Sequence, residues 1–263
     1  MRYCARVRRK LAVATGALAL VAAGGSAAAA VTLADSPASG QQVTVAAPRH
    51  PAQRPLLAVV GASFSAGVGA GNRAHAWPED LARIMGWRLA VSADPGAGYV
   101  NPGAGHRGPF SQLAAHLHLA RLDPGVVIIQ GGHDDIGRPL PLIRSRVESL
   151  ISTIRRQDPR GRLAVLTVFP RGRPDPAALA TDQAIVAAAR RADPAVLVFD
   201  PIASHWQFPR IGDHLHPAPA GHEWIARHLA AGLRDPGTLD RDRAPSGPKP
   251  VSSLNVQPRP DVR

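Results

Sequence analysis

Cysteine is almost absent from this sequence, which has a single one, Cys4, among 263 residues. Cys4 precedes the apolar stretch 11–25, whereas the lipid-bearing cysteine of an exported lipoprotein follows such a stretch. If the N-terminal segment is removed on export, the remaining chain has no cysteine and can form no disulfide. The hydrophobic core alone then has to stabilise the folded domain.

Acidic and aromatic residues are both scarce. The chain has 19 Asp and Glu against 31 Lys and Arg, a formal net charge of +12, and its aromatic content is 4%. Five positive charges lie in the first ten residues, and the others are scattered among alanines and prolines. Because no basic run contains interleaved aromatic residues, the charge does not predict a nucleic-acid partner.

Long apolar runs are missing except near the N-terminus, where basic residues precede LAVATGALALVAAGG (11–25). Small residues follow, and this order predicts a secretory signal peptide over residues 1–30, cleaved near Ala28 or Ala30. The alternative is an uncleaved membrane anchor, for which the run is short. Such an anchor is the only membrane contact predicted. Both alternatives predict a secreted or cell-surface protein.

Polar, proline-rich sequence lies on both sides of the central part of the chain. Residues 31–54 are predicted to be a linker and residues 236–263 a disordered tail, because neither segment has a helical pattern. Residues 55–235 have the size of one domain. The hydrophobic content of 45% is enough for a sizeable core.

Within this domain, short apolar runs alternate with helical patterns. The predicted strands are 56–63, 87–93, 125–132, 162–169 and 195–202, and the predicted helices are 77–86, 110–120, 141–157, 176–192 and 220–233. This alternation predicts an α/β fold with a five-stranded parallel sheet and helices on both faces. Ligands of such sheets bind beyond the carboxyl ends of the strands, so the residues directly after each strand are the functional candidates.

Ser63 follows the first predicted strand in the segment GASFSAG (61–67). A serine at such a glycine-flanked turn is either a nucleophile or simply the cap of a helix. The segment does not match the GxSxG motif of α/β-hydrolases. Three polar residues also follow the third predicted strand, namely His133, Asp134 and Asp135. Asp200 follows the fifth and is assigned no role.

Near the end of the domain, Asp213 and His216 form a D-x-x-H pattern before Pro217. A carboxylate three residues before a histidine can accept its Nδ1–H, which leaves Nε2 free to take a proton from a serine. His214 is expected to face elsewhere, and His222 to lie in the first turn of the last helix.

A metal site is an alternative interpretation of the same segments. GGHDD and GDHLH resemble the GNHD and GHxH elements of dinuclear metallophosphoesterases, whose metals take carboxylate and imidazole ligands. That family also needs a D-x-H at the end of the first strand, where this chain has GASFS. No metal or organic cofactor is therefore expected.

In chain order, the segments after the strands resemble the sequence blocks of the SGNH (GDSL-type) hydrolase superfamily, over residues 56–233. VVGASFSAG is similar to the GDSxS block, PGAGY occupies the place of the glycine block, GGHDD that of GxND, and DHLHP that of D-x-x-H-P. The resemblance implies a three-layer flavodoxin-like fold and a serine mechanism. It also implies catalytic Ser63, Asp213 and His216, with an oxyanion hole formed by the N–H groups of Ser63 and Gly96, or of Gly98 in place of Gly96.

Two positions depart from the family pattern. Ala62 replaces the aspartate of the first block, which is not itself a catalytic group. Asp134 occupies the position of the asparagine that donates to the oxyanion, and an ionised carboxylate cannot donate. Either burial keeps Asp134 protonated, or His133 supplies the missing donor, or catalysis is weakened.

The resulting hypothesis is an exported serine esterase that hydrolyses carboxylic esters of lipids, small acyl compounds or acylated carbohydrates through an acyl-enzyme. The alternatives are a catalytically weakened, glycan-binding module and a metal-dependent phosphoesterase. Acyl transfer to a carbohydrate would use the same residues as hydrolysis. Trp206 and Phe208 are expected either to line a substrate pocket or to pack beneath their own loop.

Overall fold

The computed structural model describes residues 54–235. The predicted signal peptide or anchor (1–30), nearly all of the linker and the tail (236–263) lie outside the described residues. None of the described helices is long and apolar enough to cross a membrane.

Five parallel strands form one sheet in the order β2-β1-β3-β4-β5. This is the strand order of flavodoxin-like folds. The strands are β1 (Leu56–Gly61), β2 (Arg88–Ala93), β3 (Val126–Gln130), β4 (Arg162–Leu166) and β5 (Leu197–Phe199). Each lies within one of the predicted strands, so the prediction of a five-stranded parallel sheet is confirmed.

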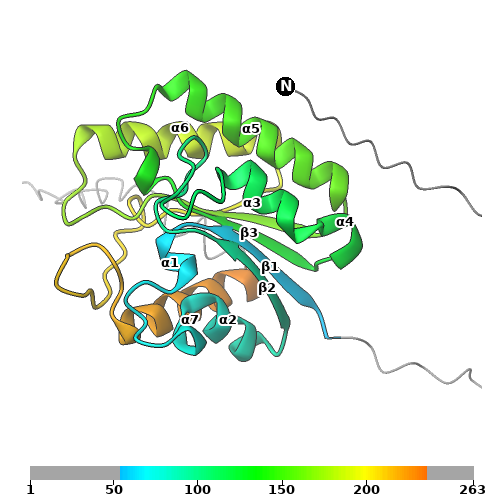
Figure 1. Cartoon of the computed structure of the whole chain (residues 1–263), viewed down its shortest axis with the longest axis horizontal. Helices are drawn as coiled ribbons and strands as arrows, with labels where there is room; N and C mark the ends of the chain where they lie inside the picture. Colours follow the sequence, from blue (N-terminus) through cyan, green and yellow to red (C-terminus); the bar gives the residue numbers. More distant parts are fainter. Residues whose placement is uncertain (1–53, 236–263) are drawn as a thin grey trace, which may run out of the picture. The chain divides into compact units, whose positions relative to one another are not determined.

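Helices cover both faces of the sheet (Figure 1). One face carries α3 (Phe110–Leu117), α4 (Leu119–Leu122), α5 (Leu140–Gln157) and α6 (Pro176–Ala192), and the other carries α2 (Trp77–Met85) and α7 (Pro219–Arg234). Three short elements connect strands and helices, namely α1 (Ser63–Ala66), η1 (Arg73–His75) and η2 (His133–Asp135). The three-layer arrangement is therefore also as predicted.

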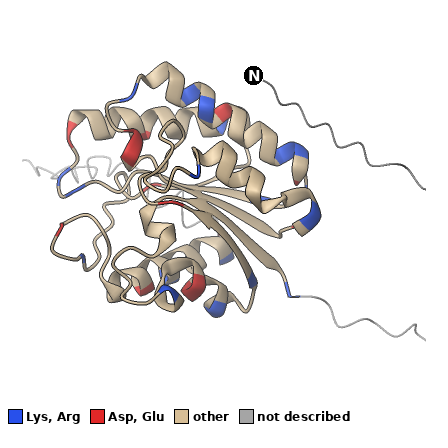
Figure 2. Ribbon diagram, in the orientation of Figure 1, with Lys and Arg blue, Asp and Glu red and all other residues tan. Residues whose placement is uncertain are grey.

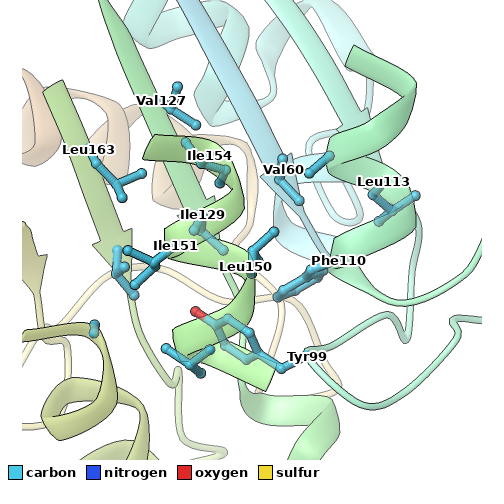
Figure 3. Close-up of a cluster of buried hydrophobic side chains, with 14 of the residues drawn as sticks. Val60, Tyr99, Phe110, Leu113, Val127, Ile129, Leu150, Ile151, Ile154 and Leu163 are labelled. Carbon is cyan, nitrogen blue, oxygen red and sulfur yellow. The ribbon is translucent and has the colours of Figure 1, made fainter. Parts of the chain in front are cut away.

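The core has two halves, because successive strand residues point to opposite faces of a sheet. On β1, Ala58 and Val60 pack against α3, α5 and α6, whereas Leu57 and Val59 pack against α2 and α7. Figure 3 shows the first half, in which β3 and α5 contribute several of the labelled aliphatic side chains. Burial of such side chains contributes about 1.5–3 kcal/mol each relative to exposure.

Two local features differ from the sequence-based expectations. The predicted helix 110–120 breaks at His118, which has a left-handed conformation (φ 50°) and separates α3 from α4. No glycine or proline marks this break in the sequence. Strand β2 is only partly buried because it forms the edge of the sheet, although its sequence is as apolar as that of a covered strand.

The carboxyl ends of the strands lie in one row. Gly61 of β1 pairs with Gln130 of β3, Gln130 with Leu166 of β4, and Leu166 with Phe199 of β5. The segments that follow these residues therefore begin at the same edge of the sheet. Charged residues, by contrast, are spread over the helices on both faces of the sheet (Figure 2).

Candidate active site

Ser63 is the first residue of α1, the single helical turn that follows β1. Its side chain is buried and does not cap this turn, since the N-cap position is Ala62 and no side-chain cap bond is formed. The turn is tied to the neighbouring strand by Gln130 Oε1, which accepts from Ser65 N (3.1 Å) and Ser65 Oγ (2.7 Å). A Cβ at Gly61 would collide with the Ser65 side chain, so the tight turn requires glycine there.

The Ser63 side chain meets His216, which is 153 positions later in the chain. His216 Nε2 lies 2.9 Å from Ser63 Oγ, and His216 Nδ1 lies 2.5 Å from Asp213 Oδ2. Because a carboxylate only accepts, Nδ1 carries the proton, and Nε2 is left to accept from the serine hydroxyl. The three predicted residues are thus brought together in one hydrogen-bonded line.

Asp213 is held by its own loop as well as by His216. Its Oδ1 accepts from the backbone N–H groups of Leu215 and His216, both at 2.9 Å. The hydrogen bond from His216 and these backbone donors hold the pKa of Asp213 well below its usual range. The carboxylate therefore stays ionised next to the imidazole in neutral and mildly acidic solution.

The other two histidines of this segment point elsewhere, as predicted. His214 has a left-handed backbone (φ 60°) and borders a neighbouring cavity. His222 lies in the first turns of α7 and is buried, with Nδ1 accepting from Trp77 N (3.2 Å) and Nε2 donating to Val68 O (3.0 Å). Burial lowers the pKa of His222, so it is a neutral link between α7, α2 and the segment after α1.

Gly96 and Gly98, the two alternatives for an oxyanion donor, differ in their hydrogen bonds. The Gly98 N–H donates to Asn101 O (3.0 Å), whereas the Gly96 N–H has no acceptor among residues 54–235. Gly96 has a left-handed backbone (φ 78°), which suits glycine. Gly98 is needed for packing, because a Cβ there would collide with the Asp135 carboxylate.

Asp135 is fully buried and holds the loop after β2. Its carboxylate accepts from the backbone N–H groups of Tyr99 (2.7 Å), Val100 (3.0 Å) and Asn101 (3.2 Å). Burial raises its pKa, and these three donors counteract that shift. The sequence placed Asp135 at the correct edge of the sheet. Its anchoring role was not predicted, because the loop that it holds lies some 35 positions earlier in the chain and no pattern near Asp135 indicates this contact.

Asp134 lies beside Asp135 with much of its side chain buried. Burial, together with the charge of Asp135, raises the pKa of Asp134 to about 6. Its backbone carbonyl accepts from Asn101 Nδ2 (2.9 Å), which fixes η2 against the loop after β2. Asp134 is thus protonated in mildly acidic solution and ionised at neutral pH.

His133 is not a suitable donor in its neutral form. Its Nδ1 lies 3.0 Å from the Phe169 carbonyl, which can only accept, so Nδ1 carries the proton. Burial lowers the pKa of His133, which keeps the ring neutral and leaves Nε2 without a hydrogen to donate. The expectation that His133 replaces the family's asparagine is at odds with this geometry.

A stack of aromatic rings supports the site and was not anticipated. Phe64, next to Ser63, stacks on Phe169 with ring centroids 4.4 Å apart, and it lies 5.5 Å from the His216 ring. Phe208 packs edge-on against Phe169 at 5.6 Å. Trp206 is buried in the core and also borders the cavity beside the site, as does Phe208, so both expectations for these two residues hold in part.

Within residues 54–235, no group of three or more His, Cys, Asp or Glu side chains is placed to hold a metal ion. The GGHDD and GDHLH segments face the same edge of the sheet, but their side chains are engaged in the separate contacts described above.

A flavodoxin-like sheet with hydrogen-bonded Ser, His and Asp side chains beyond its strand ends is the architecture of SGNH-type hydrolases. The chain belongs to the GDSL-like lipase/acylhydrolase family, whose model matches residues 59–224. The resemblance inferred from the sequence blocks is therefore confirmed. A search of curated proteins finds no matching relative.

Solved structures with the same fold include esterases. A family two carbohydrate esterase from Clostridium thermocellum, in complex with cellohexaose, is 16% identical with a TM-score of 0.54. The match covers 72% of this chain and 66% of that enzyme, slightly less than two thirds of its length. The psychrotrophic esterase EstA from Pseudoalteromonas sp., inhibited by monoethylphosphonate, is 15% identical with a TM-score of 0.54. The match covers 70% of this chain and 98% of that one.

A third structure is a carbohydrate esterase whose active site is described as having divergent catalytic and non-catalytic binding functions. It is 16% identical with a TM-score of 0.57, and the match covers 72% of this chain and 71% of that one. At these sequence identities, the structural similarity shows a shared fold and nothing beyond it.

Proposed function

We propose that the protein is a serine esterase that hydrolyses carboxylic esters through an acyl-enzyme, with Ser63 as nucleophile, His216 as base and Asp213 as its positioning carboxylate. The observation that carries the proposal is the unbroken hydrogen-bonded line from Asp213 Oδ2 through both nitrogens of His216 to Ser63 Oγ. Membership of a lipase and acylhydrolase family supports the same reaction class.

The reaction uses one base for both steps. His216 Nε2 takes the hydroxyl proton as Ser63 Oγ attacks the ester carbonyl carbon, and Asp213 stabilises the imidazolium that forms. The proton then passes to the alcohol oxygen as the ester bond breaks and the alcohol leaves. Water attacks the acyl-enzyme, gives a proton to Nε2, and the acid leaves as the proton returns to Ser63 Oγ.

The backbone N–H groups of Ser63 and Gly96 are the proposed oxyanion donors. The free N–H of Gly96 supports its choice over Gly98, whose N–H is engaged with Asn101. Asp134 supplies a third donor in its protonated form, since its pKa of about 6 leaves an O–H present in mildly acidic solution. Each such donor is typically worth about a hundred- to a thousandfold in turnover.

Acylated carbohydrates are the proposed substrate class, and the cell exterior the proposed location. Carbohydrate esterases among the structural neighbours support the first. The second rests on the N-terminal sequence, where a basic segment, an apolar run and small residues follow one another.

The test is hydrolysis of 4-nitrophenyl acetate and longer acyl esters by the purified protein and by Ser63→Ala. We expect measurable turnover by the wild type and a fall to background in the variant, because the substitution removes the hydroxyl that is hydrogen-bonded to His216 Nε2. Equal rates for the two proteins overturn the assignment.

A glycan-binding module is the second candidate, and the carboxylate at position 134 favours it, because an ionised Asp134 repels a developing oxyanion. This candidate predicts glycan binding without turnover and no covalent labelling by a serine-directed phosphonate. Stoichiometric labelling of Ser63 by the phosphonate decides in favour of the esterase.

A further inference from the structure

A cavity of about 990 Å³ has in its lining His214, the residue that directly follows Asp213. It lies between the segment after β4, the segment after β5 and the loop that carries Asp213 and His216. This volume is at the upper end of the range for small-molecule sites, so it can hold more than the acyl group of a simple ester. Its charged and titratable lining residues are all basic: Arg173, His205, Arg210 and His214.

The acidic residues nearest in sequence to this lining are committed to other contacts. Asp175 Oδ1 accepts from Ala178 N (2.7 Å) at the start of α6. Asp200 Oδ1 accepts from Ala203 N (2.8 Å) in the turn after β5. Asp213 is bound to His216. Because none of the three lines the cavity, its basic side chains have no carboxylate partner among the lining residues.

Arg210 is the most firmly positioned of the four basic residues. Its Nη1 donates to Pro170 O (2.6 Å) and to His214 O (3.0 Å), and its guanidinium lies 4.7 Å above the Phe208 ring. It forms no ion pair within 4 Å among residues 54–235. Burial lowers the pKa of Arg210, and the nearby charge of Asp213 counteracts this shift. The remaining N–H groups of this planar cation are suited to a carboxylate or a phosphate.

The two histidines of the lining have strained backbones. His205 (φ 51°) and His214 (φ 60°) both have the left-handed conformation that favours glycine. Non-glycine residues in this conformation cost free energy and are concentrated at functional sites. At both positions the chain has a histidine that lines the cavity rather than the glycine that the backbone favours.

The cavity lies near the reacting groups, although none of them belongs to its lining. His214 directly follows Asp213, and Phe208 contacts Phe169, which stacks on Phe64 beside Ser63. The proposed binding mode places the ester carbonyl of a substrate at Ser63 and a more distant part of the same molecule in this cavity.

The geometry points to a subsite for an anionic group of the substrate, so that the enzyme acts on acylated acidic carbohydrates. This inference rests on the proposed function, because it takes Ser63 to cleave the ester of the substrate. The subsite itself is defined by binding and can be tested without turnover. The anion is the carboxylate of a uronic acid or the phosphate of a phosphorylated sugar, and the aliphatic and aromatic walls contact the sugar ring.

Binding is measured by calorimetry at low ionic strength with the full-length Ser63→Ala protein, which cannot turn over an ester. The probes are tetragalacturonate, its fully methyl-esterified form and glucose 6-phosphate. We expect one or both anionic probes to bind at least about tenfold more tightly than the neutral one, and the difference to shrink as salt is added. Preference for the carboxylate or for the phosphate identifies the source of the anion.

Two further variants and a matched control locate the site. Arg173→Glu is expected to weaken binding of the anionic probe by about five- to tenfold, the range for an exposed charge that is reversed. His205→Gly removes an imidazole where the backbone favours glycine, so it should weaken binding about threefold with an unchanged or higher melting temperature. Arg146→Glu, an exposed arginine of α5 outside the cavity, should change nothing.

Equal affinities for tetragalacturonate and its methyl ester, with no binding of glucose 6-phosphate, overturn the subsite. An equal loss in Arg173→Glu and Arg146→Glu does so as well, because it shows only the effect of net charge. Neither result touches the esterase assignment, which fails separately if ester hydrolysis does not depend on Ser63.

Discussion

At the scale of single residues, the proposed site combines a well-ordered base with an acidic residue at the proposed third oxyanion position. Asp213 and the backbone hold His216 in the tautomer that a serine nucleophile needs. Asp134 occupies the position of an amide donor, but burial raises its pKa only to about 6. Asp134 therefore offers a donor in mildly acidic solution and a repulsive charge at neutral pH, so we expect the proposed oxyanion hole to depend on pH.

The Asp134→Asn variant tests this dependence. The amide donates at every pH, whereas the carboxyl donates only below about pH 6, so the ratio of kcat/KM for the variant to that of the wild type should rise with pH. Between pH 5 and pH 8 we expect this ratio to increase by up to about a hundredfold. The ratio is the readout because it cancels the pH effects that the two proteins share.

A stability measurement provides the control for this variant. The pKa of Asp134 in the folded state lies above its ordinary value of 3.8, so ionisation disfavours the fold and stability is lost as pH rises through about 6. The variant should therefore unfold at a higher temperature than the wild type at pH 8 and at nearly the same temperature at pH 3.5. A variant that is inactive at all pH values would show that Asp134 has a role of its own.

At the scale of elements, the loop after β2 takes its shape from a carboxylate of η2 rather than from its own sequence. Asp135 accepts three consecutive backbone N–H groups, and Gly98 leaves room for that carboxylate. The same loop contains Gly96, the proposed oxyanion donor. The position of a donor on one loop thus depends on an aspartate from another.

Asp135→Asn should disturb both stability and catalysis. The amide NH₂ would face N–H donors and leave buried groups unpaired, which costs about 1–3 kcal/mol. We expect a lower free energy of unfolding in denaturant titrations and a lower kcat, because Gly96 shifts. Glu223→Gln is the control, since Glu223 is an exposed residue of α7 whose carboxylate pairs with Arg227 one turn later. An Asp135→Asn protein with wild-type stability would refute the anchoring role.

At the scale of the whole molecule, the central strands carry the stability of the domain. β1, β3 and β4 are covered on both faces, and their side chains belong alternately to the two halves of the core. Because Cys4 is the only cysteine of the chain, no intramolecular disulfide supplements this core. Stability therefore depends on packing.

Ile128→Ala is the corresponding prediction. Ile128 is fully buried in the centre of β3, and its truncation should cost about 2–5 kcal/mol in the free energy of unfolding. Leu142→Ala, on the exposed side of α5, should change it by no more than about 0.5 kcal/mol. Equal effects of the two substitutions would contradict the two-sided core.

Much of the fold follows from local sequence. The strands and most helices were predicted from short stretches of sequence. A buried strand requires a run of apolar residues, and an amphipathic helix requires apolar residues that repeat about every 3.6 positions. The break at His118 was not predicted, because a single left-handed residue leaves no such pattern. The contact between Asp213 and His216 was also accessible, since residues three apart meet in one turn.

Only the tertiary structure decided how distant segments meet. The pairing of Gly61 with Gln130, and of Gln130 with Leu166, sets the edge of the sheet at which Ser63 lies next to His216. The pKa of Asp134 depends on burial, which is a property of everything packed around it. The basic cavity likewise unites three separate segments. Local periodicity encodes the elements, whereas contacts between residues far apart depend on the register and packing of the whole domain.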